Sequence, residues 1–293
     1  MKSSWQREIE TVNEALDSYL PPATTFPPEI HQAVRYSIFA GGKRLRPLLN
    51  LATAAVFDVP ERHALPTACA LEMIHTYSLI HDDLPALDND DFRRGRPANH
   101  KVFGEALAIL AGDALLTLAF EILATETAAF FPAQTVVALQ QEVSKAAGMA
   151  GMIGGQVVDV LSEGKPLKAE TLEYIHRHKT GALITCCVRC GAIMGQATKE
   201  ELCLLTSFAQ KIGLAFQIVD DILDVVGDEK CLGKKTGSDV SKKKMTYPAL
   251  YGVQQSQVMA DKLLAEAFTA VEYFGERASK LKQLANLLVK RQQ

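Results

Sequence analysis

The chemistry-bearing residues of this chain concentrate in residues 75–94, a stretch rich in carboxylates. Asp82 and Asp83 close a run with helical periodicity, and Pro85 then disfavours helical geometry at the residue before it and removes a backbone donor. We therefore expect the chain to leave the helix there and to bring Asp88 back toward the acidic pair. A helix C-terminus already carries partial negative charge, so a carboxylate cluster there requires a compensating cation. Because oxygen ligands without Cys or His favour Mg²⁺ over zinc, the stretch predicts a magnesium site.

Two further features indicate that the ligand carries phosphate. Arg93 and Arg94 follow the first acidic cluster, and two guanidinium groups beside a magnesium site are typical of a phosphate-bearing ligand. A second cluster, Asp220, Asp221 and Asp224, closes another apolar helical run, with its outer members four residues apart on one helix face. A solvated acidic loop is the simpler interpretation of either cluster alone. Two clusters facing each other across a cavity would instead hold a diphosphate through bridging Mg²⁺ ions.

A basic turn predicts a further anion site. Lys43, Arg44 and Arg46 follow Gly41 and Gly42 at the point where the next helix begins. Helix N-terminal amides together with Lys and Arg side chains bind anions. A basic surface turn explains the same residues equally well from the local sequence.

Four segments resemble the motifs of trans-prenyl diphosphate synthases, in order and at that family's spacing. They are G-G-K-R-L-R-P (41 to 47), H-D-D-L-P-A-L-D-N-D-D-F-R-R-G (81 to 95), H-K-T-G (178 to 181) and F-Q-I-V-D-D-I-L-D (216 to 224). The match runs from about residue 35 to 250 and is similar above all to the bacterial farnesyl-forming members. The resemblance implies an all-α fold, a single large helical bundle of the isoprenoid synthase type around a central cavity, in one domain over residues 1–293.

The resemblance also implies the reaction, which is head-to-tail condensation of isopentenyl diphosphate with dimethylallyl and geranyl diphosphate to give farnesyl diphosphate. Mg²⁺, as a set of three ions, and Lys/Arg side chains neutralise the leaving diphosphate so that the allylic C–O bond ionises. The alkene then attacks the cation and a proton is lost. The metal ligands implied are Asp82, Asp83, Asp88, Asp220, Asp221 and Asp224.

By the same resemblance, each substrate has its own set of residues. The diphosphate of isopentenyl diphosphate is held by Gly42, Lys43 and Arg46, with help from His75 and Arg94. Arg93 is also expected to bind diphosphate. The residues implied for the allylic substrate are Lys179 and Lys234 on its diphosphate, Thr180 and Gln217 on the allylic carbocation, and Lys244 in a loop that closes over the site. From local sequence alone, His75 is a packed core histidine and Lys179 a solvated surface lysine.

Product length is expected to depend on Tyr77, which lies five positions before Asp82 and roughly 7 to 8 Å further down the helix. Ser78 points more directly along the same face, and core packing is the alternative interpretation of the Tyr77 ring. The resemblance implies that an aromatic residue here, with the two extra residues Pro85 and Ala86 inside the acidic motif, forms the floor of the pocket. We therefore expect a C15 product, and the alternative is a geranylgeranyl diphosphate synthase with a C20 product.

Two other classes of protein share parts of this pattern. A class I terpene cyclase has a similar first acidic motif, but its second motif would read Asn/Asp-Ser/Thr-Glu, and it needs no Gly-Gly-Lys-Arg turn. A non-catalytic partner subunit that binds prenyl diphosphates would have lost some acids or basic residues, and none is missing here.

Composition narrows the class of protein further. The 293 residues are 48% hydrophobic and contain no low-complexity linker, which favours one large core. A net charge of −3 favours neither nucleic acid nor an anionic membrane as a partner. We expect no apolar run to reach the roughly 18 residues of a membrane span, and residues 1–17 lack an apolar signal core, so a cytoplasmic protein is expected. Six cysteines are interpreted as reduced thiols, with Cys186, Cys187 and Cys190 packed on a helix face rather than binding a metal.

Helical periodicity runs from end to end and predicts the elements that position these residues. We expect helices over 5–19, 28–39, 98–126, 135–161, 169–195 and 249–289, with breaks at Gly104 and Gly112 and an interruption at 178–181. Small residues between 106 and 119 permit close helix approach, and the family resemblance places a homodimer contact there. The interruption at 178–181 frees backbone carbonyls that can face a cavity and stabilise a cation.

Overall fold

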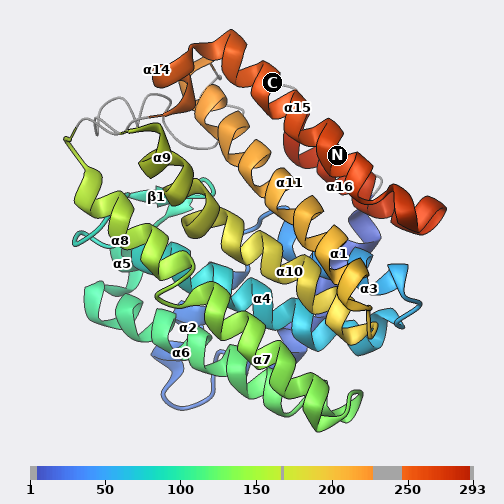
Figure 1. Cartoon of the computed structure of the whole chain (residues 1–293). Coiled ribbons are helices and arrows are strands. Elements are labelled where there is room, and N and C mark those ends of the chain that lie inside the picture. Colours follow the sequence, from blue (N-terminus) through green and yellow to red (C-terminus); the bar gives the residue numbers. More distant parts are fainter. Residues whose placement is uncertain (1–4, 166–167, 227–245, 291–293) are drawn as a thin grey trace. The chain divides into compact units, whose positions relative to one another are not determined.

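The computed structural model describes residues 5–165, 168–226 and 246–290, and these are almost entirely helical (Figure 1). The first half of the chain contains α1 (Gln6–Tyr19), α2 (Pro28–Ile38), α3 (Leu45–Val56), α4 (Glu61–Asp82), β1 (Phe92–Arg93), β2 (Arg96–Pro97), α5 (Asn99–Phe103), α6 (Glu105–Ala124), η1 (Thr127–Ala129) and α7 (Ala133–Ala147). The second half contains α8 (Met152–Ser162), α9 (Ala169–Ile175), the π-helical turn η2 (His176–Thr180), α10 (Gly181–Met194), α11 (Lys199–Val226), α14 (Tyr247–Tyr251), α15 (Val253–Ala270), η3 (Glu272–Ala278) and α16 (Ser279–Val289). The all-α prediction is confirmed.

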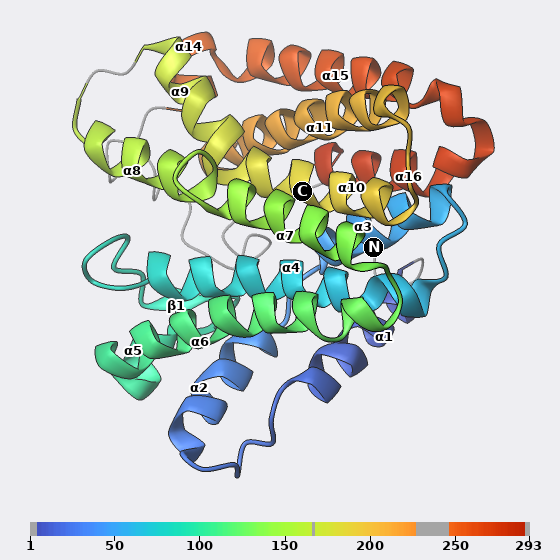
Figure 2. The same cartoon turned by 60° about the horizontal axis from the view of Figure 1, so that its bottom comes forward.

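The chain forms two compact units. One consists of Met1–Leu51 with Glu61–Gln140, and the other of Ala52–Pro60 with Gln141–Gln293. In the first unit α4 and α6 lie side by side, and in the second α11 packs against α10 and α15 (Figure 2). The prediction of one domain over the whole chain stays a prediction.

The central helix of the first unit is α4, which is buried on nearly all sides. Ala68, Leu71 and Ile74 have no exposed surface, and between Ala64 and Ile80 buried residues lie on every side of the helix, which is the pattern of a helix inside a protein. The polar side chains that α4 does carry, among them Glu72 and His75, lie where water is scarce. Such groups need partners, so they indicate where the chemistry of this unit lies.

The predicted helix over 98–126 breaks at Gly104 but not at Gly112. Gly104 has a φ of +83° and separates α5 from α6. Gly112 lies inside α6, where a Cβ atom would come within 2.1 Å of His81 Nε2. The break predicted at Gly112 is therefore wrong. This glycine instead lets α6 approach α4, whose His81 ring lies with Nε2 3.0 Å from the carbonyl oxygen of Ile109.

The helices predicted over 135–161 and 169–195 are each divided. Between α7 and α8 the chain turns at Gly148 and Gly151, and a Cβ atom at Gly151 would lie 2.1 Å from the Ala146 carbonyl oxygen. Between α9 and α10 the helix widens into the π-helical turn η2. The interruption predicted around 178–181 is confirmed.

The cysteines of α10 lie in the core of the second unit. Cys186, Cys187 and Cys190 are at most 1% exposed and carry free thiols, and the Sγ atoms of Cys186 and Cys190 are 3.7 Å apart. These side chains fill a helix face, as predicted.

Two helical stretches are long and apolar enough to cross a membrane by length and composition. They are Glu105–Ala129 and Lys199–Val226, in which 39% and 50% of the most apolar window is buried. The expectation that no run reaches this length is wrong. A core helix passes the same test, so the expected absence of a membrane partner stays a prediction.

Candidate active site

The first acidic cluster forms at the end of α4, as predicted. Asp82 is the last residue of the helix, and its backbone carbonyl accepts a hydrogen bond of 2.8 Å from the N–H of Asp88. The turn between them is closed by a second backbone bond, from the N–H of Leu87 to the carbonyl of Leu84 at 2.9 Å. The chain thus leaves the helix after Asp82, turns at Pro85 and returns Asp88 to the acidic pair.

Asp83 is held inside the first unit by an arginine of the hairpin that follows. Its side chain is 3% exposed, and Oδ1 accepts a hydrogen bond of 2.9 Å from Nε of Arg93. Burial raises the pKa of Asp83 above its ordinary value, although the Arg93 guanidinium acts in the opposite direction. Arg93 therefore serves at least to anchor the acidic motif to the hairpin.

A tight hairpin that sequence reasoning did not find positions the two arginines. Phe92 pairs with Pro97 and Arg93 with Arg96, in antiparallel register. The turn residues Arg94 and Gly95 both have positive φ, 54° and 76°, as expected for the favoured two-residue hairpin turn. This geometry sends Arg93 and Arg94 to different partners.

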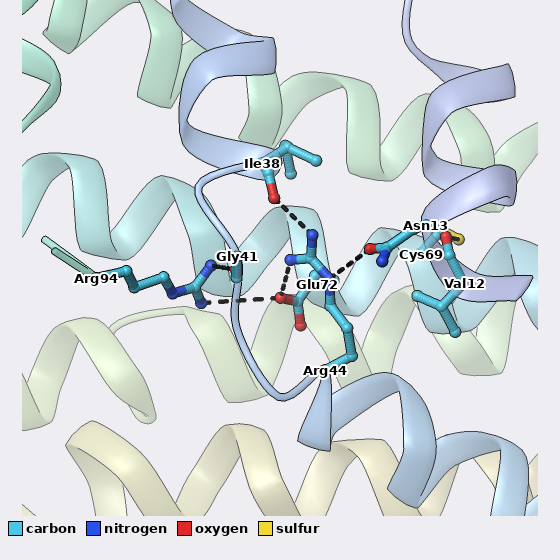
Figure 3. A network of polar contacts seen from close by, with 8 residues as sticks. All are labelled: Val12, Asn13, Ile38, Gly41, Arg44, Cys69, Glu72 and Arg94. Atoms are coloured by element: carbon cyan, nitrogen blue, oxygen red, sulfur yellow. Dashed lines mark hydrogen bonds and ion pairs between the residues drawn. The ribbon is translucent and has the colours of Figure 1, made fainter. Parts of the chain in front are cut away.

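Arg94 reaches back to the basic turn (Figure 3). Its guanidinium donates a hydrogen bond to the Gly41 carbonyl, and its Nη2 lies 4.0 Å from Oε1 of Glu72. At Gly42, where φ is +124°, a Cβ atom would come within 2.8 Å of this guanidinium. Glycine at position 42 therefore suits the positive φ of the backbone and leaves room for the Arg94 guanidinium.

The cations of the basic turn have different environments. Arg44 is buried and donates hydrogen bonds from Nη1 to Glu72 at 2.8 Å, from Nε to Asn13 at 2.9 Å and from Nη2 to the Ile38 carbonyl at 2.6 Å (Figure 3). Lys43 is exposed and Arg46 is half-buried. Arg44 thus ties the turn to α1, α2 and α4 and is shielded from an anion, whereas Lys43 and Arg46 are accessible to one.

His75 lies in a strongly positive field. Removal from water lowers the pKa of His75 well below its ordinary value, and the nearby charges of Arg46, Arg94, Arg93 and Arg44 lower it further. The imidazole is therefore neutral at physiological pH. A neutral ring among four guanidinium groups fits a site for an anion, which would compensate the positive charge.

Tyr77 is one of the buried residues of α4. It is 5% exposed, its ring meets His81 edge-on with 5.8 Å between centroids, and its hydroxyl has no hydrogen-bond partner among the described residues. Burial, followed by the charge of Asp82, raises the pKa of Tyr77 to about 12. Ser78 is half-buried and donates to the His75 carbonyl at 2.8 Å. The effect of either residue on product length stays a prediction.

In the second unit, η2 brings Lys179 and Thr180 to defined partners. Lys179 Nζ lies 2.7 Å from Oδ2 of Asp159 in α8, and the Thr180 hydroxyl donates to Oε1 of Gln217 in α11 at 2.9 Å. A Cβ atom at Gly155 would lie 2.2 Å from the backbone nitrogen of Lys179, so glycine permits α8 to lie against the turn. Sequence reasoning had assigned no role to Asp159, since its partner is 20 residues away.

The second acidic cluster lies in the last two turns of α11, which continues to Val226. Asp221 and Asp224 are buried, and Asp220 is half-buried. Oδ2 of Asp221 accepts hydrogen bonds of 3.0 Å from Nε2 of His176 and from the backbone N–H of Tyr247. His176 was missed in the sequence, where nothing distinguishes it from His178, which instead stacks on Tyr174.

Lys234 and Lys244 lie outside the described residues. Within the described ranges, no three His, Cys, Asp or Glu side chains are grouped so that they could hold a metal ion by themselves. Mg²⁺ is usually bound by one or two carboxylates together with substrate phosphates, so the six carboxylates stay predictions as ligands.

The comparisons with known proteins identify the family. The family model for polyprenyl synthetase matches residues 27–287. The geranylgeranyl diphosphate synthase of Cyanophora paradoxa is 47% identical over 96% of this chain and 93% of its own length. The farnesyl diphosphate synthase of Geobacillus stearothermophilus is 51% identical over 82% of this chain and 81% of its own. The crystal structure of an FPP/GFPP synthase from Zymomonas mobilis superposes with a TM-score of 0.87 at 38% identity, over 99% of this chain and all of the other.

This chain belongs to the polyprenyl synthetase family. It is a trans-prenyltransferase of isoprenoid biosynthesis with the all-α isoprenoid synthase fold. The family uses isopentenyl diphosphate and allylic diphosphates as substrates and is generally Mg²⁺-dependent.

Proposed function

We propose that this prenyltransferase condenses isopentenyl diphosphate with dimethylallyl and geranyl diphosphate and releases farnesyl diphosphate. The observation that carries the choice of a C15 product is Tyr77, a buried bulky ring in α4, five residues before Asp82. A prenyl tail that is anchored at Asp82 and grows along α4 meets this ring at a depth of roughly 7 to 8 Å. The ring is held by packing, since its hydroxyl has no hydrogen-bond partner in the described part of the chain.

The alternative is a geranylgeranyl diphosphate synthase with a C20 product. It has about equal support, because relatives of both product classes are close to 50% identical to this chain. The two functions share the anion sites and the acidic motifs. They differ in how far the tail extends past Tyr77.

The side chains that bind the homoallylic substrate are proposed to be Lys43 and Arg46, with His75 and Arg94. Lys43 is exposed and Arg46 half-buried, so both are accessible to an anion. His75 is neutral because of burial and the surrounding arginines, and it can donate a hydrogen bond without adding charge. Arg94 is already oriented by the Gly41 carbonyl and by Glu72.

Magnesium fits the acidic motifs, because their carboxylate oxygens are the hard ligands that Mg²⁺ prefers. Asp82 and Asp88 are joined through their backbones at 2.8 Å, and Asp220 and Asp224 lie one turn apart on α11. When bound, the ions neutralise the charge of the diphosphate that leaves. We propose that Asp83 and Asp221 also orient their motifs, because Arg93 and His176 hold their carboxylates.

The allylic substrate is proposed to bind through Lys179, with Thr180 and Gln217 beside the reacting carbon atoms. Lys179 is paired with Asp159 at 2.7 Å, so a diphosphate oxygen would compete with, or add to, this carboxylate. The oxygen atoms of Thr180 and Gln217 can stabilise the allylic cation by their dipoles, since they cost no reorganisation when they are held in place. The alkene of isopentenyl diphosphate then forms the new C–C bond, and a proton is lost from the resulting cation.

We further propose a cytoplasmic homodimer. α6 is the most apolar helix of the first unit, yet Ile109 and Leu110 are 44% and 54% exposed. A groove of about 720 Å³ runs between α6 and the start of α2, lined mainly by apolar side chains that include Leu107, Leu110 and Leu118. An apolar face of this kind fits a second copy of the same helix.

Product sizing tests the proposed function. Purified protein with Mg²⁺, isopentenyl diphosphate and dimethylallyl diphosphate should give mainly C15 product and no product in excess chelator. Tyr77→Ala should shift the output to C20 or longer, whereas Tyr77→Phe, which keeps the ring, should still stop at C15. A parent enzyme that makes mostly C20 would establish the alternative, and a pure protein without any turnover would favour a non-catalytic partner subunit.

A further inference from the structure

His176 is the first residue of η2 and is 7% exposed. Its Nε2 lies 3.0 Å from Oδ2 of Asp221, and its ring stacks on Tyr247 with 5.5 Å between centroids and 19° between planes. The same Asp221 oxygen accepts the backbone N–H of Tyr247 at 3.0 Å. Because an ionised carboxylate only accepts, Nε2 of His176 is assigned as the donor of this hydrogen bond.

The other oxygen of Asp221 determines the orientation of a neighbouring amide. Oδ1 accepts a long hydrogen bond, 3.4 Å, from Nε2 of Gln217, one turn earlier in α11. In the opposite orientation the Gln217 carbonyl would face the carboxylate, and two acceptors would repel each other. Asp221 therefore keeps Oε1 of Gln217 turned toward η2.

The Gln217 carbonyl in turn determines where the Thr180 hydroxyl points. Thr180 is the last residue of η2, and its hydroxyl donates to Oε1 of Gln217 at 2.9 Å. With the hydroxyl hydrogen directed at Gln217, the lone pairs of the Thr180 oxygen point elsewhere. The four side chains thus form a hydrogen-bonded chain that runs from one end of η2, through one turn of α11, to the other end of η2.

This hydrogen-bonded chain distinguishes His176 from a histidine that only fills space in the core. His176 and Thr180 are the two ends of η2, and their partners Asp221 and Gln217 are four residues apart on α11. A single hydrogen bond would satisfy a buried imidazole. Here Asp221, which accepts that bond, also orients the amide of Gln217. This amide in turn orients the hydroxyl of Thr180 at the other end of η2.

We infer that His176 is a positioning residue for prenyl transfer: by holding Asp221 it fixes the amide of Gln217 and, through it, the hydroxyl of Thr180, whose lone pairs then face the positive charge that develops on the allylic substrate. The inference rests on the proposed roles of Thr180 and Gln217. It does not depend on product length, since the same cation forms in every condensation step.

Matched substitutions at position 176 test the hydrogen bond. Gln can place an N–H close to the position of the His176 Nε2, whereas Asn is one methylene shorter and cannot reach Asp221. We expect His176→Asn to lower kcat about 10- to 100-fold with little change in the KM for the allylic diphosphate, in line with other residues that orient a functional group. His176→Gln should keep kcat within a few-fold of the parent. Equal losses in both variants would overturn the inference.

A double-mutant cycle tests the coupling to Thr180. If His176 acts through the Thr180 hydroxyl, His176→Asn should cause little further loss of kcat in a Thr180→Val background. Multiplicative losses, with Thr180→Val itself impaired, would overturn the inference and leave the proposed function intact. If Thr180→Val alone keeps full kcat, the proposed role of Thr180 fails and the inference fails with it. The free energy of unfolding, measured for each variant, separates these outcomes from a loss of folded protein.

Discussion

Adjacent residues of the basic turn differ more in their environment than in their chemistry. Arg44 is 3% exposed and donates to three groups on different elements, including Glu72, which is 1% exposed. Its neighbour Lys43 is exposed. The two positions therefore separate the stability of the fold from the binding of an anion.

Arg44→Met should lower the free energy of unfolding by about 3 to 5 kcal/mol, because it leaves the Glu72 carboxylate buried without its main partner. Lys43→Met is the matched control. It should leave the free energy of unfolding within about 0.5 kcal/mol of the parent and raise the KM for isopentenyl diphosphate. Urea denaturation and steady-state kinetics check the two halves of this prediction. Equal stabilities for the two variants would mean that the Arg44 network contributes nothing net.

Because of His75, the free energy of unfolding should depend on pH. Burial and four arginines lower its pKa well below the ordinary 6.5 in the folded state, so the unfolded chain binds more protons at mildly acidic pH. The contribution of His75 to the free energy of unfolding is therefore intact above about pH 6.5. It is lost as the pH falls toward the folded-state pKa, and the free energy of unfolding then decreases by at most about 1.4 kcal/mol per pH unit. The His75→Gln variant should lack this slope, so the difference in free energy of unfolding between parent and variant, measured by urea denaturation at a series of pH values, should fall as the pH falls below about 6.5. A constant difference would show that His75 has the same pKa in both states.

At the scale of elements, the site depends on interruptions of regular helix. The turn that contains Pro85 follows the end of α4 at Asp82 and returns Asp88 to it, and the π-helical turn η2 joins α9 to α10. Each interruption is stabilised by a close backbone approach or by a polar partner on another element. The close approach of α8 to η2 at Gly155 gives a direct test.

Gly155→Ala sets two opposing effects against each other. Alanine raises helix propensity by about 1 kcal/mol, but its Cβ atom would lie 2.2 Å from the backbone nitrogen of Lys179, which cannot rotate away. Overpacking typically costs about 1 to 3 kcal/mol, and a backbone contact belongs at the upper end. We expect a net loss of stability and a higher KM for the allylic diphosphate. Val157→Ala, at a half-exposed position of the same helix, is the control and should change neither quantity appreciably.

At the scale of the whole molecule, the packing of one folded chain does not explain the exposed apolar face of α6. Leu110 is 54% exposed and lines the groove beside α2. Leu110→Glu should convert a dimer into monomers in sedimentation velocity, because a charge would be desolvated at the centre of the contact. Val258→Glu on α15 makes the same chemical change at a position of equal exposure and should leave the dimer intact. A parent protein that is monomeric at micromolar concentration would contradict the homodimer.

Local patterns were sufficient to predict the all-α class, the end of α4 at the acidic pair, the return of Asp88 and the interruption at η2. Each of these depends on residues within about one or two helical turns, where periodicity and the steric effects of proline act. The same local reasoning failed at Gly112, where the helix continues and the absent side chain leaves room for the His81 ring. It also missed the hairpin turn at Arg94 and Gly95, which only two residues on each side support.

The sequence by itself determined which residue types could bind diphosphate and magnesium, since four short motifs carry them at fixed spacing. Only the tertiary structure decided which of those side chains are buried against partners within the protein. Arg44 meets Glu72 across 28 residues and His176 meets Asp221 across 45, and no local pattern encodes such partners. The physical reason is desolvation: a buried charge must find a partner wherever the fold places one, and an exposed neighbour such as Lys43 need not.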